Sequence, residues 1–276
     1  MDTRTGRILL RLGAYVVLAF LYIPLALIFL YAFNPARGQA WPPPGLTTDW
    51  FAVAWRNGDV RSALLASLEA GFGATAIALF LGSGAAFAVH RFRFFGRESL
   101  SFALVLPLAL PGIVTAMALN SAINFGGNLF GLSFGLFTII VGHATFCVVV
   151  VYNNVIARLR RTAGSLTEAS MDLGADGWQT FRYVTLPSIS TALVAGGLLA
   201  FALSFDEIIV TNFTSGTVET LPKWIFKNMR LPHSAPIVNV VAMAVTLLSL
   251  IPVYFAQRLT RETGGALPGG TRERTV

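Results

Sequence analysis

The stretch RLRRTAGSLTEASMDLGADGWQTFRYVTLPS, residues Arg158 to Ser188, lies between two apolar runs and decides the fold of the chain. The runs cover about residues 132–156 and 188–207, and each has the roughly 20 mostly apolar residues that a membrane-spanning helix needs. The stretch between them carries too many charged and polar side chains to cross a bilayer. We therefore predict a water-exposed segment that connects two transmembrane helices.

The pattern of this polar segment predicts two short helices around a glycine. Ser165 and Glu168 have the S-x-x-E spacing of a capping box, so a helix is expected to start there. Gly174 suits the C-terminal stop of that helix, because glycine adopts the left-handed conformation without steric strain. Asp176 and Gln179 form a second capping pair, which is expected to start the second helix.

The first of these helices has two different faces. Leu166, Ala169 and Leu173 recur at helical spacing on one face, whereas Glu168 and Asp172 lie four residues apart on the other. Two like charges at this spacing destabilise an isolated helix by about 0.2–0.5 kcal/mol. A basic partner surface would offset this cost.

The composition of the whole chain is that of a membrane protein. Of its 276 residues, 55% are hydrophobic and 12% are charged, and the mean hydropathy is +0.68. These values exclude a soluble enzyme, a disordered regulator and a disulfide-stapled secreted module. Cys147 has no second cysteine to pair with and is expected to be a small buried side chain.

Six transmembrane helices are predicted, so the expected fold is an all-α polytopic membrane protein with a single transmembrane domain over residues 1–276. Pro107 and Pro111 interrupt the third span, and His143 in the fourth is expected to be a hydrogen-bonded packing residue. Small residues (Gly71, Gly73, Gly82 and Gly84) line the second. Either these features let helices pack closely, or the broken third helix faces a pathway. The predicted spans are about residues 12–33, 62–89, 101–122, 132–156, 188–207 and 237–257, with a disordered tail at about 264–276.

The distribution of basic residues predicts the orientation in the membrane. Fourteen of the 20 Lys and Arg residues lie on the side that holds both termini, and six lie in the loops on the other side. By the positive-inside rule, both termini are cytoplasmic in a multi-pass protein of the cell membrane. The net charge of +7 therefore reflects topology, and no nucleic-acid partner is expected, because no single face collects the charge.

Three acidic residues near the ends of predicted spans are candidates for a substrate path. Asp206 and Glu207 end the fifth span, and Glu69 lies near the outer end of the second. Ionisable groups in spans are costly and are functional candidates for that reason, and a cluster of carboxylates would attract a cationic solute. Alternatively, these acids are interfacial residues or partners of Arg61 or Lys223.

The sequence does not contain the elements for ATP hydrolysis. A Walker A loop needs a lysine after a glycine-rich stretch, but the only lysines, Lys223 and Lys227, follow Pro222 and Phe226. No cofactor is therefore expected in this chain, and any energy from ATP hydrolysis must come from another polypeptide.

Residues 168–187, EASMDLGADGWQTFRYVTLP, resemble the EAA signature of the membrane subunits of ATP-binding-cassette (ABC) importers. In that signature E-A-A is followed by a glycine at a fixed spacing and then by Leu-Pro, and Ser170 here replaces the usual third-position alanine. The matching residues are Glu168, Ala169, Gly174, Leu186 and Pro187. Other segments are similar to the spermidine/putrescine permease branch of this family: YIPLALIFLYAFN from Tyr22, HRFRFFG from His90, LPLALPGIV from Leu106 and ALSFDEIIVTNFTSG from Ala202.

The resemblance implies a type I importer permease that forms half of the translocation path for a small cationic solute such as putrescine or spermidine. Residues 165–187 would form its coupling segment, whose helix with Glu168 and Asp172 docks in a cleft of an ATPase subunit. The implied partners are an ATPase dimer that binds ATP and Mg²⁺, a second permease subunit in a heterodimer, and an extracytoplasmic substrate-binding protein. Glu168 then contacts the ATPase, completes its capping box, or does both.

Alternatives remain for the substrate and for the class of protein. Some permeases of this branch carry an acidic residue directly after the proline of the third span, where this chain has Gly112, so another small solute is an alternative. An ion-coupled secondary carrier or channel is the rival from a different class. It leaves the spacing of Gly174 and Leu186-Pro187 unexplained.

Overall fold

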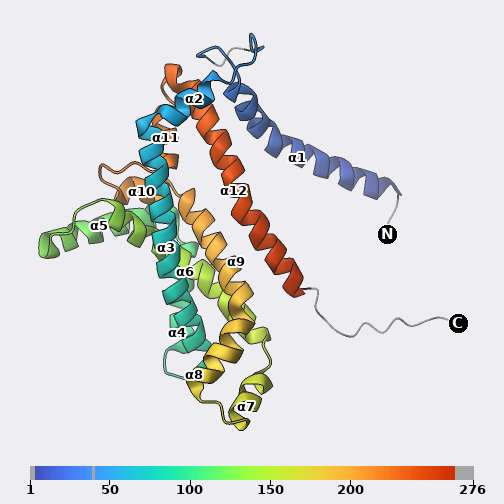
Figure 1. Ribbon diagram of the computed structural model, residues 1–276, viewed down its shortest axis with the longest axis vertical. Coiled ribbons are helices and arrows are strands. Elements are labelled where there is room, and N and C mark those ends of the chain that lie inside the picture. Colours follow the sequence, from blue (N-terminus) through green and yellow to red (C-terminus); the bar gives the residue numbers. More distant parts are fainter. Residues whose placement is uncertain (1–3, 39–40, 265–276) are drawn as a thin grey trace. The chain divides into compact units, whose positions relative to one another are not determined.

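Helices form the fold over residues 4–38 and 41–264, which are the residues that the computed structural model describes (Figure 1). Two compact units can be distinguished: one contains Met1–Ser62 and Trp224–Leu248, and the other contains Ala63–Lys223 and the chain from Ser249. The elements in chain order are α1 (Arg4–Ala32), α2 (Asp49–Arg56), α3 (Gly58–Arg91), α4 (Arg97–Ala109), α5 (Gly112–Phe130), α6 (Leu136–Arg161), α7 (Gly164–Asp172), α8 (Gly177–Thr180), the π-helix η1 (Phe181–Thr185), α9 (Leu186–Phe205), α10 (Ile209–Thr214), α11 (Leu221–Asn228), the 3₁₀-helix η2 (Pro232–Ser234) and α12 (Ala235–Gly264).

The prediction of an all-helical membrane fold is confirmed. By length and composition, four stretches of the described residues can cross a membrane: Gly6–Ala32, Gly58–Arg91, Leu136–Arg161 and Gly177–Phe205. The bent pair formed by α4 and α5 also passes this test when the two helices are taken together, and as one span it would be the fifth. The sixth predicted span corresponds to α12, whose apolar part, Ala235–Ile251, is shorter than the others. The tail predicted beyond α12 lies outside the described residues.

In the first unit, hydrogen bonds order the connection that follows α1. The side chain of Asn34 is buried, and its backbone carbonyl accepts a hydrogen bond from Trp50 Nε1 at 3.0 Å. The Thr47 amide donates to the Phe33 carbonyl at 2.7 Å. The large apolar side chains of α1, such as Phe20, are exposed, which suits a helix that faces lipid.

The core of the second unit lies where α3, α6 and α9 pack together. Small residues on α3 permit this close approach: a Cβ atom on Gly82 would lie 2.8 Å from the Val148 carbonyl oxygen. Gly71 and Gly73 are equally close to side chains of α9 and α6, whereas Gly84 has open space around it. Three of the four glycines therefore lie at close helix contacts, as the packing interpretation predicts, whereas Gly84 has no such neighbour among the described residues.

Cys147 is buried in this core and has no disulfide partner, as predicted. Its thiol donates a hydrogen bond to the Ala200 carbonyl at 3.3 Å. The side chain therefore links α6 to α9 as a small core residue.

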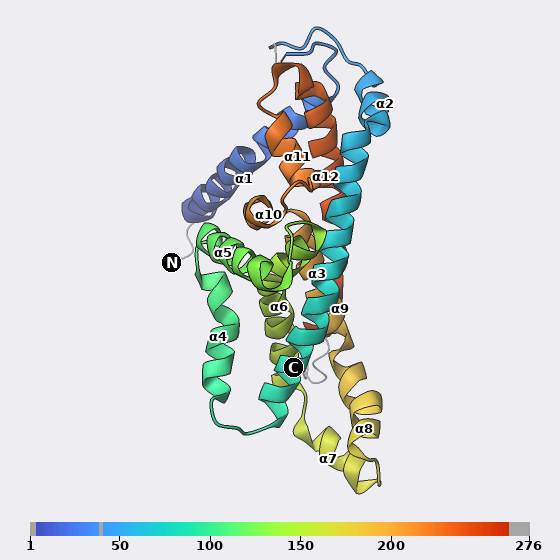
Figure 2. The ribbon, with the colours of Figure 1, turned by 90° about the vertical axis from the view of Figure 1, so that its left-hand side faces the viewer.

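The third predicted span is broken, and only one of its two prolines causes the break. Pro107 lies inside α4, whereas Pro111 directly precedes α5 and has no N–H to continue the helix. Leu110, the residue before Pro111, is extended with φ −83° and ψ 144°, as the proline ring requires. The two halves meet at an angle of 102°, so α5 runs across the direction of α4 (Figure 2). The broken third helix is thus confirmed.

Several helices extend beyond the predicted spans. The helix of the fifth predicted span begins well before residue 188, because α8, η1 and α9 form one continuous helical stretch, Gly177–Phe205. The π-helical turn precedes Pro187, which lies in the first turn of α9, so the missing proline N–H breaks no regular α-helical ladder. The third span does not end near residue 122, because α5 continues to Phe130 and stops at Gly131, which has φ +69°.

Candidate coupling segment and transport path

The helix α7 starts earlier than predicted, and the capping box proposed for it is wrong. Its N-cap is Ala163, which makes no side-chain cap, so Ser165 lies inside the first turn and Glu168 in the middle of the helix. The reason is the short link from α6, which ends at Arg161 and leaves two residues before α7 begins. Thr162 belongs to the end of α6, since its hydroxyl donates to the Arg158 carbonyl at 3.2 Å.

Gly174 ends α7 as predicted. Its φ of +88° is left-handed, and its amide donates to the Met171 carbonyl at 2.9 Å. The next amide, of Ala175, donates to the Ser170 carbonyl at 3.1 Å. This pair of hydrogen bonds is a Schellman motif, which satisfies carbonyl groups that the helix end would leave without donors.

The second predicted cap is confirmed at α8. The Asp176 carboxylate accepts hydrogen bonds from the amides of Trp178 and Gln179, both at 2.8 Å. In return, the Gln179 side chain accepts from the Asp176 amide at 2.9 Å. A reciprocal cap of this kind fixes where the helical stretch that becomes α9 begins.

A hydrogen bond between side chains ties α7 to α8. Ser170 Oγ lies 3.1 Å from Thr180 Oγ1, and Thr180 is buried at 3% exposure. An alanine at position 170, as the EAA signature usually has, could not make this contact. The serine therefore adds a polar link between the two halves of the coupling segment, residues 165–187.

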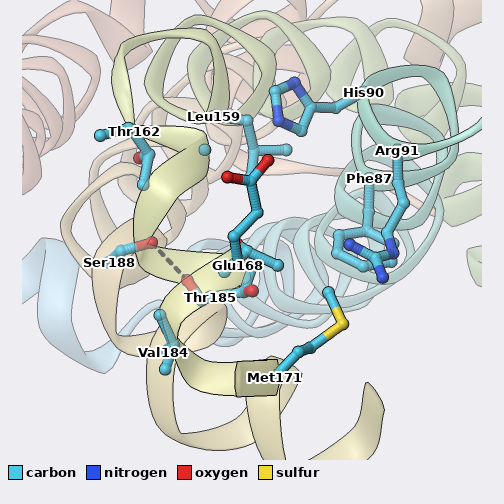
Figure 3. Close-up of a pocket in the computed structure, with 13 residues that line it drawn as sticks. Phe87, His90, Arg91, Leu159, Thr162, Glu168, Met171, Val184, Thr185 and Ser188 are labelled. Atoms are coloured by element: carbon cyan, nitrogen blue, oxygen red, sulfur yellow. Dashed lines mark hydrogen bonds between the residues drawn. The ribbon is translucent and has the colours of Figure 1, made fainter. Parts of the chain in front are cut away.

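Glu168 lines a pocket beside α7 (Figure 3). The pocket has a volume of about 300 Å³. It lies where α7 meets the C-terminal end of α3, the end of α6 and the start of α9. Figure 3 shows the Glu168 carboxylate pointing toward His90 and Leu159 and away from Met171. His90 and Arg91 line the opposite wall, where Arg91 contributes a positive charge.

The apolar side chains of α7 are not covered within the chain. None of its residues is buried, Leu173 is 89% exposed, and Leu166 and Met171 are also exposed. Trp178 and Tyr183, in the next helical stretch, add two exposed aromatic rings. Exposed apolar side chains next to a hydrophilic segment are typical of a surface that binds another protein.

Aromatic packing connects the coupling segment to a membrane-spanning helix. Phe181 stacks on Trp178 with ring centroids 5.7 Å apart and meets Phe87 of α3 edge-on at 5.3 Å. Arg158 at the end of α6 donates to the Ser188 carbonyl of α9 at 2.9 Å. Through these contacts, a movement of α7 and α8 would displace α3, α6 and α9.

The three candidate acids have different environments. Glu207 is half-buried, and its Oε1 accepts a hydrogen bond from the Val210 amide at 3.0 Å, so it caps the start of α10. Asp206 is exposed, and no described residue makes a hydrogen bond to its carboxylate. Glu69 is exposed on α3, and within the described residues no hydrogen bond or ion pair joins it to either of the other two. The three acids are therefore not in direct contact with one another among the described residues.

His143 makes two hydrogen bonds in the core, as predicted for a packing residue. Its Nδ1 lies 2.8 Å from Ser204 Oγ, and its Nε2 lies 2.9 Å from Thr211 Oγ1. Ser204 and Thr211 lie on the two sides of the break between α9 and α10. His143 therefore joins α6 to both helices that flank Asp206 and Glu207.

The break before α5 lies close to α10. A Cβ atom on Gly112 would lie 4.0 Å from Ile209 Cδ1, and Asn120 Nδ2 donates to the Phe213 carbonyl at 2.6 Å. The position after Pro111 is therefore near the helix that follows Asp206. Two helix breaks that meet in a membrane leave backbone groups that line a path or are satisfied by protein.

Sequence reasoning missed several partners of the predicted site residues. Thr180 and Phe181 lie inside the quoted motif, but a hydroxyl and a ring carry no local signal of their distant partners. Ser204 and Thr211 are separated from His143 by 61 and 68 residues. A polar residue in each of three apolar runs was the available signal, because such groups find partners in lipid.

Comparisons with known proteins agree with this geometry. Residues 78–264 match the family described as binding-protein-dependent transport system inner membrane component. The spermidine/putrescine transport system permease protein PotC of Haemophilus influenzae is 32% identical over 250 residues, which cover 90% of this chain and 95% of that protein. The putrescine transport system permease protein PotI of Escherichia coli is 32% identical over 256 residues, which cover 88% of this chain and 89% of that protein.

A solved structure shows the same fold. One chain in the crystal structure of a bacterial alginate ABC transporter, in complex with an alginate pentasaccharide-bound periplasmic protein, matches with a TM-score of 0.71. The match covers 95% of this chain and 96% of that chain at 16% sequence identity. The predicted ABC importer permease fold is thereby confirmed.

Proposed function

The chain belongs to the family of binding-protein-dependent transport system inner membrane components, and we propose that it forms half of the translocation path of an ABC importer for a polyamine. Putrescine and spermidine are the proposed solutes, because they appear in the names of relatives that are 32% identical over most of their length. The exposed Asp206 carboxylate at the break between α9 and α10 suits a cationic solute.

The observation that carries the proposal is the build of the coupling segment. α7 leaves Leu166 and Leu173 exposed, while Ser170 and Phe181 connect it to the start of α9 and to α3. A segment that passes a conformational change from an ATPase to membrane helices needs an exposed docking surface and direct contacts with those helices. We infer that the ATPase covers α7 and that the pocket beside Glu168 admits a basic side chain of that subunit.

The proposed division of labour gives this chain no catalytic step. The two lysines do not follow a glycine-rich phosphate loop, so ATP and Mg²⁺ would be bound by a separate ATPase dimer. Closure of that dimer would push α7, and the connected helices would alternate the path between its two sides. The Glu168, Ala169, Ser170, Asp172, Gly174, Leu186 and Pro187 positions form the proposed coupling site.

The remaining features of the complex are proposed from the charge pattern and from the family. Both termini lie in the cytoplasm, because fourteen of the 20 basic residues lie on that side. The chain is a single transmembrane permease domain that pairs with a second, paralogous permease. An extracytoplasmic binding protein delivers the solute to Asp206, Glu207 and Glu69 at the outer half of the path.

Uptake into proteoliposomes tests this function. The chain, its second permease, the ATPase and the binding protein are reconstituted together with ATP inside, and labelled putrescine and spermidine are added outside. We expect uptake that needs both ATP and the binding protein. Uptake driven by an ion gradient without ATP would instead indicate a secondary carrier, and ATP-dependent uptake of an uncharged or anionic solute would indicate a different substrate.

A further inference from the structure

His143 sits in a chain of hydrogen bonds that crosses three helices. It is 1% exposed, and both of its ring nitrogens face hydroxyl groups that are also buried, Ser204 Oγ and Thr211 Oγ1. The chain continues, because the Thr211 hydroxyl lies 2.7 Å from the Glu207 carbonyl and donates to it. A buried histidine in a membrane helix is costly, and here both ring nitrogens have hydrogen-bond partners.

The direction of each hydrogen bond follows from the number of available hydrogens. The Thr211 hydroxyl has one hydrogen, which goes to the Glu207 carbonyl, so Thr211 Oγ1 accepts from His143 Nε2–H. No acidic side chain among the described residues is hydrogen-bonded to the ring, so the neutral imidazole is the form that this site stabilises. Its Nδ1 then accepts from the Ser204 hydroxyl.

This chain of bonds ends on the backbone between α9 and α10. Glu207 is held twice, since its carbonyl accepts from Thr211 and its carboxylate accepts from the Val210 amide at 3.0 Å. Ser204 fixes the last turn of α9 on the other side. Asp206 lies between these two anchors and is exposed. The orientation of Asp206 thus depends on bonds that meet at His143.

We propose that His143, as the Nε2–H tautomer, is a positioning residue that fixes the break between α9 and α10 and so directs the Asp206 carboxylate into the path. The role of Asp206 in the path rests on the proposed function, whereas the positioning of its side chain does not. Ring packing alone is the competing explanation, because His143 also contacts Phe146 at a centroid distance of 5.6 Å.

Two substitutions at position 143 separate these explanations. His143→Phe keeps a ring against Phe146 but removes both hydrogen bonds. His143→Gln removes the ring but offers one acceptor and one donor, as the proposed tautomer does. Positioning predicts that Gln preserves the environment of residue 206 and Phe does not, whereas packing predicts the reverse.

The measurement is the chemical accessibility of residue 206 in the assembled transporter in membrane vesicles. Asp206→Cys is made in a Cys147→Ala background, in which this chain holds no other cysteine, and its rate of reaction with a cationic methanethiosulfonate is followed relative to the transporter that carries Cys147→Ala alone. We expect His143→Phe to change this rate about tenfold, since breaking buried hydrogen bonds shifts a local equilibrium by about one to two powers of ten. His143→Gln should stay within about threefold of the parent. A rate that His143→Phe leaves unchanged, or that only His143→Gln changes, would overturn the proposal.

A second pair of variants covers the case in which a substitution at position 143 prevents assembly. Thr211→Ser keeps the hydroxyl that links His143 to Glu207, and Thr211→Val removes it at similar volume. Only Thr211→Val should change the labelling rate, and equal rates would contradict the proposal. If labelling responds as expected but Asp206→Asn transports polyamines normally, the positioning stands and the proposed path fails.

Discussion

Ser170 Oγ lies 3.1 Å from Thr180 Oγ1, and this contact joins the helix that carries Glu168 to the first turn of the stretch that becomes α9. Ser170 is half-buried and Thr180 is buried, so the hydrogen bond is shielded from water. The link therefore ties α7 to the helical stretch that becomes α9.

Removing this link should loosen α7. Ser170→Ala deletes a hydrogen bond worth about 0.5–1.5 kcal/mol, so amide hydrogen exchange in Gly164–Asp172 should become roughly two to twelve times faster. Ser165→Ala is the matched control, because Ser165 is exposed and caps nothing. Equal exchange rates in the two variants would show that Ser170 does not stabilise α7. Faster exchange in Ser165→Ala would instead indicate that Ser165 does cap the helix.

The close contact between α3 and α6 should make Gly82 intolerant of a side chain. Gly82→Val pushes a methyl-bearing carbon toward the Val148 carbonyl, and overpacking of this kind costs about 1–3 kcal/mol. Gly84→Val on the same helix meets open space and is the control. The thermal stability of the purified complex is the measurement. Equal stability of both variants would mean that α3 and α6 do not approach as described.

The local part of the coupling segment could be predicted from the sequence, because caps and stops are set by neighbouring residues. Gly174 and the Asp176–Gln179 pair are examples. The start of α7 could not be predicted, since it depends on where α6 ends and on the two-residue link between them. The continuity of α8 with α9 was hidden by Pro187, which a π-helical turn accommodates.

The membrane spans and the candidate acids were visible in the sequence, but the roles of the acids were not. Asp206 and Glu207 are adjacent and chemically alike, yet only Glu207 uses its side chain to accept a hydrogen bond from a helix amide. That difference depends on where α10 begins, and no local sequence pattern predicted that start. His143 bonds to residues on α9 and α10, which lie 61 and 68 positions further along the chain. Contacts between such distant positions cannot be predicted from a single sequence.

The two acids should respond differently to neutralisation. Asp206→Asn removes a charge that faces the proposed path, and the uptake rate with saturating, putrescine-loaded binding protein should fall about fivefold, since a charge pair about 4 Å apart in water is worth about 1 kcal/mol. Glu207→Gln keeps an oxygen that can accept from the Val210 amide, so its effect should be smaller. If Glu207→Gln reduces uptake more than Asp206→Asn, Asp206 is not the principal contact.

A carboxylate added at position 112 should favour the more highly charged solute. Gly112 is the first residue of α5, where an acid interacts favourably with the helix dipole, and its nearest neighbour, Ile209 Cδ1, leaves room for a side chain. Gly112→Asp should raise the ratio of spermidine to putrescine uptake, while the uncharged Gly112→Asn should not. An equal change in both variants would indicate an effect of size and not of charge.

The central claim is that α7 transmits ATP hydrolysis to the path, and simultaneous measurement of ATP hydrolysis and putrescine uptake in the same proteoliposomes tests it most directly. Glu168→Ala with Gly174→Val removes the acid beside the pocket and places a β-branched residue at φ +88°, which disrupts the end of α7. We predict that the double variant stays in the membrane, that hydrolysis continues, and that uptake per ATP falls about tenfold or more, as expected when a coupling free energy of about 1.4 kcal/mol or more is lost. Uptake per ATP equal to that of the unaltered transporter would contradict the account.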